Sequence, residues 1–175
     1  VTGVQTCALP ISQGFFKGFG FFNNLPNEKN CVIADVTIAN DVQDIVNIVK
    51  TISLKSDFTK IIPNIYAKLT DIYTKIGKAS AGCAAYANEI KSVVDRMKNY
   101  TKGIKYWSNL AIHVATNIGT ITNKIKSGVN AYTANNYDQS GQIFGQLVVY
   151  VFFKDFSPTQ SYFENINEVE VEVQD

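Results

Sequence analysis

The sequence predicts an all-α protein: a single-domain bundle of five or six mainly antiparallel helices. Apolar residues recur in alternating steps of four and three along most of the chain, which is typical of helices buried along one face. The expected helices are joined by only a few residues, which favours antiparallel neighbours. The chain has 175 residues, of which 46% are hydrophobic, and this is enough for one core.

Residues 1–11, VTGVQTCALPI, carry neither a helical period nor a capping residue. The string resembles the translation of a short-read sequencing adapter. We therefore expect it to be a non-native segment that packs on nothing specific, and we exclude it from fold reasoning as one excludes a processing remnant. Two consequences follow. Cys7 leaves the cysteine count, and we expect the true N-terminus, with a signal peptide, to lie upstream of Ser12.

The first expected helix, within Ser12–Leu25, is apolar on nearly all sides. It contains five phenylalanines: Phe15, Phe16, Phe19, Phe21 and Phe22. Its glycines each weaken an isolated helix by about 1 kcal/mol, so packing must hold it in place. Such a helix is either buried or binds something. The alternative to burial is therefore a contact between these phenylalanines and a membrane surface or a protein partner.

Regular four–three seams predict the next two helices. Over Asp35–Ser53 the seam consists of Ile38, Val42, Ile45, Val49 and Ile52. Up to Gly77 a second seam consists of Ile62, Tyr66, Leu69, Tyr73 and Ile76. This third helix starts either with Asp57 as its N-cap or with Pro63 in its first turn.

Three more helices are expected before the end of the domain. The first covers Ala79–Tyr100, and the residues expected to face inward in it are Cys83, Tyr86, Ile90, Val93, Val94 and Met97. After Gly103 the longest seam of the chain runs through Trp107, Ala111, Val114, Ile118, Ile121 and Ile125. Ser140–Phe153 forms the last helix through Ile143, Phe144, Leu147, Val148, Val151 and Phe152, and the helical domain covers residues 12–156.

Residues 157–175 are expected to be an acidic, mobile tail. Glu164–Asp175 holds five acidic residues and no basic one. Such a charge run is usually solvated. The alternative is that the tail folds back on a basic face of the body.

The first and last expected helices each contain a small-xxx-small motif, in which two glycines are separated by three residues. Gly14 and Gly18 share one helical face, as do Gly141 and Gly145. Paired glycines at this spacing allow two helix backbones to approach closely. The motifs predict that these helices pack on each other, with a membrane-active or partner-binding hairpin as the alternative. Both helices are too short to span a bilayer.

Cys31 and Cys83 are the two remaining cysteines, and we predict that they form a disulfide. The bond would close a loop of about 50 residues, which the chain-entropy model values at about 4 kcal/mol. It implies an oxidising compartment. The alternative is two buried thiols in a cytosolic protein. Asn99 begins an N-glycosylation sequon, Asn-Tyr-Thr, which is compatible with secretion.

The remaining polar residues give little support to catalysis. His113 is the single histidine and has no His or Cys at ligand spacing, so we interpret it as structural. The carboxylates fall between seam positions and indicate solvated faces: Asp35, Asp41, Asp44, Asp71, Glu89 and Asp95. We therefore expect no catalytic residue, metal or cofactor. A formal net charge of +1 also argues against nucleic-acid binding.

Three stretches together resemble small secreted proteins of ciliated protists. They are GFFKGFGFF at residues 14–22, Leu25-Pro26 followed by Cys31, and YDQSGQIFG at residues 137–145. The resemblance implies secretion and a helical fold, and it supplies no activity. We therefore expect a secreted or lumenal, non-enzymatic protein with a binding or structural role. The alternative is a lipid- or membrane-associating protein that uses the phenylalanine-rich helix.

Overall fold

The computed structural model describes residues 2–19, 36–79 and 83–153. All regular secondary structure within these ranges is helical, so the all-α prediction is confirmed. The helices are α1 Thr2–Gly18, α2 Val36–Val49, α3 Phe58–Ala79, α4 Ala84–Tyr100, α5 Ile104–Thr116, α6 Ile118–Thr133 and α7 Tyr137–Phe152. The described part thus has seven helices, where the sequence predicts five or six.

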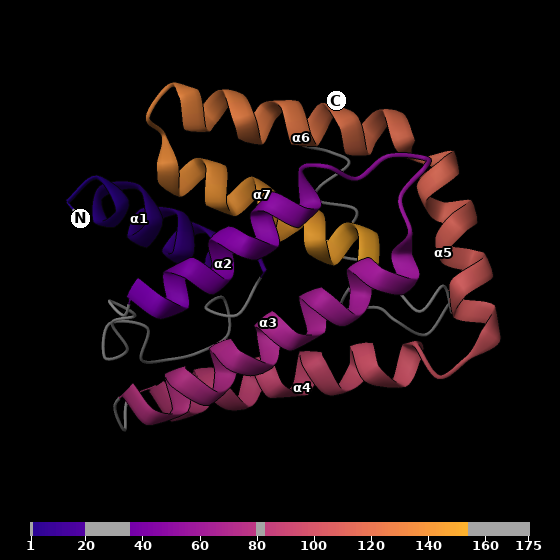
Figure 1. The fold of residues 1–175 in the computed structure, drawn as a ribbon, viewed down its shortest axis with the longest axis horizontal. Helices are drawn as coiled ribbons and strands as arrows, with labels where there is room; N and C mark the ends of the chain where they lie inside the picture. The colour runs from indigo at the N-terminus through magenta and orange to yellow at the C-terminus, as the bar shows by residue number, and fades with distance from the viewer. Residues whose placement is uncertain (1, 20–35, 80–82, 154–175) are drawn as a thin grey trace.

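The helices form two groups, one of α1, α2, α6 and α7 and one of α3 and α4, and α5 joins them (Figure 1). α7 lies between α1 and α6, and α2 packs on α1. α3 and α4 lie side by side, and α3 also contacts α2. α5 leads from the end of α4 to the start of α6, and the two groups touch where α2 packs on α3 (Figure 1).

The contact between α1 and α7 is made through glycines. A Cβ atom at Gly14 would overlap the carbonyl oxygen of Asp138, and one at Gly18 would overlap that of Gln142. In the opposite direction, a Cβ at Gly141 or Gly145 would overlap the carbonyl oxygen of a residue in α1. The two backbones therefore touch along two turns, as the paired glycine spacings predict.

The phenylalanines of α1 belong to the core. Phe15 and Phe16 are 0% exposed and Phe19 is 1% exposed. The Phe19 ring packs edge-on against Phe153, with ring centroids 5.2 Å apart. Of the two alternatives, burial therefore holds for these three side chains, which leave no surface for a membrane or a partner to contact. Phe21 and Phe22 lie outside the described residues.

Helix α1 begins well before Ser12. It runs without interruption from Thr2 to Gly18, and Ile11 is only 2% exposed. The Ile11 carbonyl lies directly against Gly141. The expectation that residues 1–11 pack on nothing specific is therefore wrong at Ile11, since the α1–α7 contact extends to it. The origin of the segment in an adapter stays a prediction.

The long run after Gly103 forms two helices instead of one, because the chain breaks at Asn117. The Asn117 side chain donates to the carbonyl oxygen of His113 at 2.8 Å and accepts from the Tyr150 hydroxyl at 2.9 Å. Asn117 also takes a non-helical φ of −111° with ψ 19°. α6 then turns back along α7 (Figure 1).

The break also changes the inward face of α5. The buried positions are Tyr106, Leu110 and Val114, which are spaced by four. Ala111, a member of the predicted seam, is exposed, and Trp107 is half-buried. The extended four–three pattern is therefore shared by two differently oriented helices.

The start of α3 follows the first of the two predicted alternatives. The Asp57 carboxylate accepts a hydrogen bond from the backbone N–H of Thr59 at 3.1 Å, as an N-cap does. Pro63 lies inside α3, beyond the first turn.

Candidate functional site

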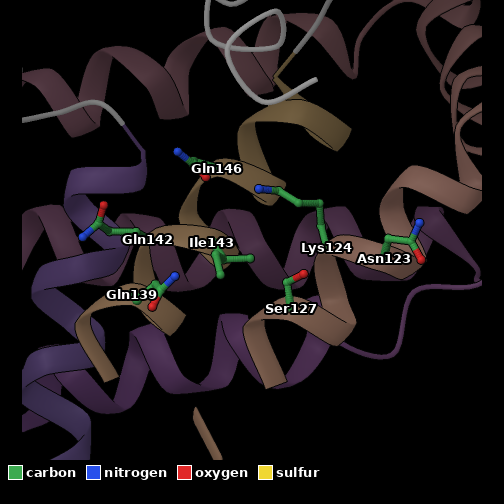
Figure 2. A pocket seen from close by; sticks show the side chains of 7 residues that line it. All are labelled: Asn123, Lys124, Ser127, Gln139, Gln142, Ile143 and Gln146. Atoms are coloured by element: carbon green, nitrogen blue, oxygen red, sulfur yellow. The ribbon is translucent and has the colours of Figure 1, made fainter. Parts of the chain in front are cut away.

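A polar cavity of about 450 Å³ lies between α6 and α7 (Figure 2). Six of its seven lining side chains are polar: Asn123, Lys124 and Ser127 from α6, and Gln139, Gln142 and Gln146 from α7. Ile143 is the single apolar member. Cavities of 300 Å³ or more are of the size that accepts a small ligand.

Close packing beside the cavity holds α6 and α7 together. The hydroxyl of Ser140 donates to the carbonyl oxygen of Gly128 at 2.8 Å. A Cβ at Gly128 would lie 2.6 Å from Cε2 of Phe144, so the ring rests directly on the glycine. The two helices are therefore fixed at a point next to the polar lining.

Lys124 is the charged member of the lining, and it is only 3% exposed. Figure 2 shows its side chain extending from α6 towards Gln146 on α7. Burial disfavours the ammonium form, so the pKa of Lys124 lies below its ordinary value.

A short chain of polar contacts orients Gln142. Its Nε2 donates to Oδ2 of Asp138 at 2.6 Å. The other oxygen of Asp138 lies 3.4 Å from Nζ of Lys17 on α1. Because Asp138 holds the amide nitrogen, the amide oxygen of Gln142 is the atom that can accept from a ligand.

Sequence reasoning missed a second polar cluster, between α2 and α3. The sequence predicts Asp41 on a solvated face, but its side chain is only 7% exposed. Its Oδ2 accepts from Nζ of Lys75 at 3.2 Å, and Lys75 also pairs with Asp71 at 2.6 Å. Lys68 completes the cluster, with Asp44 at 2.9 Å and Asp41 at 4.0 Å.

The cluster shifts the proton equilibrium of Asp41. Burial, followed by a hydrogen bond with Asp71, raises the pKa of Asp41 to about 6, although Lys75 acts in the opposite direction. The pKa of Asp71 is lowered, first by its hydrogen bond with Asp41 and then by Lys75. Asp41 therefore keeps its proton to a higher pH than Asp71 does. Asp41 lies three positions after the seam residue Ile38, on the inner edge of α2. This position in the sequence is the feature that could have indicated its burial.

His113 has structural partners. Its Nε2 lies 2.9 Å from the carbonyl oxygen of Tyr150, and its Nδ1 lies 3.2 Å from Nδ2 of Asn117. The imidazole also packs on the Tyr150 ring, with centroids 5.2 Å apart. These contacts join the α5–α6 break to α7, in agreement with the structural interpretation.

The predicted covalent sites are described only in part. Cys83 is 1% exposed and disulfide-bonded, and its partner does not lie among the described side chains. Cys31 lies outside the described residues, so the pairing with Cys83 stays a prediction. Asn99 is exposed at the end of α4. The tail, residues 157–175, also lies outside them.

Across residues 2–19, 36–79 and 83–153, no group of three or more His, Cys, Asp or Glu side chains is arranged to hold a metal ion. In the same part of the chain, no helix combines the length and hydropathy needed to cross a bilayer. Comparison of the chain with known protein families, curated proteins and solved structures finds no match.

Proposed function

We propose that this chain is a secreted, non-enzymatic protein that binds a small, uncharged polar ligand between α6 and α7. We propose further that its helices form a single-domain, mainly antiparallel bundle. The observation that carries the function is the lining of the cavity, in which neutral hydrogen-bonding groups outnumber charged ones.

The chemistry of the lining favours a hydroxylated ligand. Asn and Gln amides both donate and accept, so they match hydroxyl groups, which do the same. The lining contains four such amides and one serine hydroxyl: Asn123, Gln139, Gln142, Gln146 and Ser127. No carboxylate belongs to it, and acid–base catalysis would call for a titratable pair.

Binding is tested by saturation-transfer NMR with a panel of monosaccharides and polyols. We expect at least one to bind the wild-type protein, and the Gln146→Leu variant to bind it roughly tenfold more weakly, because a hydrogen-bonding side chain is lost from the lining. The matched control is Gln43→Leu on α2, where the amide pairs with Asn47 instead. Equal binding by both variants would contradict the assignment of the cavity.

Secretion is supported by the disulfide bond of Cys83, because disulfides form in oxidising compartments. It is tested by disulfide mapping. We expect non-reducing digestion to release a peptide pair linked through Cys31 and Cys83, with Cys7 unpaired. Cys31→Ser should lower the free energy of unfolding by about 2–4 kcal/mol. A bond between Cys7 and Cys83 would overturn both this pairing and the non-native origin of residues 1–11.

A further inference from the structure

A second cavity, of about 320 Å³, lies where α3, the end of α4 and the start of α5 meet. Its lining is mainly apolar, in contrast to the cavity between α6 and α7. Ile62 of α3 and Met97 of α4 are buried and line its inner side. Tyr66 and Trp107, both half-buried, contribute aromatic rings.

The Trp107 ring is held in a fixed orientation. Its Nε1 donates to the carbonyl oxygen of Thr101 at 3.1 Å. Its ring packs edge-on against Tyr106, with centroids 5.7 Å apart. An aromatic wall fixed in this way loses little conformational freedom when a ligand stacks on it.

Two polar groups of the lining have no partner within the described residues. The Tyr66 hydroxyl makes no hydrogen bond there, although the Tyr66 carbonyl accepts from Thr70. Lys98 is exposed and forms no ion pair with a described residue. A phenol and an ammonium group are both donors, and no carboxylate belongs to the lining.

We propose that this cavity binds a small aromatic monocarboxylate. The ligand ring lies against Tyr66 and Trp107, and its carboxylate accepts hydrogen bonds from the Lys98 ammonium and the Tyr66 hydroxyl. Aromatic walls alone would also suit an organic cation, but Lys98 repels one. The site is separate from the cavity between α6 and α7, and it stands on its own residues.

Trp107 provides the measurement, because it is the one tryptophan of the chain. Its indole N–H gives a single signal in a ¹H–¹⁵N spectrum, which is followed during titration with phenylacetate, with its neutral isostere phenylacetamide, and with acetate. We expect a saturable shift with phenylacetate, an affinity roughly tenfold lower with phenylacetamide, as for loss of a charge-assisted hydrogen bond, and no saturable shift with acetate.

Variants then test the two donors. Lys98→Met should reduce the affinity for phenylacetate to that for phenylacetamide, and Tyr66→Phe should weaken it to a smaller extent. The control Lys102→Met removes an equal charge nearby, from a side chain outside the lining, and should leave the affinity unchanged.

Three outcomes overturn the proposal. The first is the absence of a saturable indole shift at millimolar phenylacetate. The second is equal affinity for the acid and the amide. The third is an equal loss of affinity in Lys98→Met and Lys102→Met, which would indicate general attraction of anions instead of a site. None of these outcomes depends on ligand binding between α6 and α7, so the two proposals fail separately.

Discussion

Gly141→Ala is expected to destabilise the fold by about 1–3 kcal/mol, the usual cost of overpacking. The added methyl would overlap the backbone carbonyl of Ile11, and backbone atoms cannot move aside as a flexible side chain can. Gly14→Ala should act similarly through Asp138. The double variant should lose less than the sum, because one separation of α1 from α7 relieves both overlaps. Urea unfolding at constant pH measures these free energies.

Gly119→Ala is the matched control for this prediction. Gly119 lies in α6, and a Cβ there would meet no atom within 4 Å. Alanine is favoured over glycine inside a helix by about 1 kcal/mol, so this variant should be more stable than the wild type. If Gly141→Ala is stabilised by a similar amount, α1 and α7 do not touch through their backbones.

Asp41→Asn is expected to increase the free energy of unfolding at pH 8 by about 2–3 kcal/mol and to change it little at pH 4. The pKa of Asp41 is about 6 in the folded protein, against about 3.9 in an unfolded chain. As the pH rises through this window, the unfolded chain loses its proton while the folded protein keeps it. Wild-type stability therefore falls between about pH 4 and pH 6 and stays lower above it.

The size of this effect follows from the raised pKa of Asp41. A rise of about two pKa units corresponds to about 3 kcal/mol, and this net figure already includes the favourable contact of ionised Asp41 with Lys75 at 3.2 Å. Denaturant unfolding at a series of pH values should show the wild-type decline and its loss in Asp41→Asn. A decline of equal size in both proteins would place its origin elsewhere.

Asp44→Asn is the control for Asp41. Asp44 belongs to the same cluster, but its side chain is 48% exposed and pairs with Lys68 at the surface. A surface ion pair contributes about 0–1 kcal/mol. We therefore expect a small loss of stability in Asp44→Asn, without the gain at high pH that distinguishes Asp41→Asn.

The sequence by itself determined the helical class, the inner faces of several helices and the pairing of α1 with α7. These three features follow from the spacing of residues along the chain, because the helix period brings residues three and four positions apart onto one face. Ile38, Val42 and Ile45 of α2 are accordingly all buried. Gly14 and Gly18 could be paired with the α7 glycines because four-residue spacing also aligns glycines on one face. Asp57 could be identified as a cap because its bond to Thr59 is local.

Only the tertiary structure decided where α5 ends and which carboxylate is buried. The seam runs unbroken through position 117, and the hydroxyl that holds Asn117 comes from Tyr150, 33 positions later in the chain. Asp41 is covered because α3 brings Lys75 and Asp71 against it. Both cavities likewise depend on side chains from helices that meet only in the fold. Periodicity reports which face of a helix is apolar, whereas the partner of a polar group is set by long-range packing.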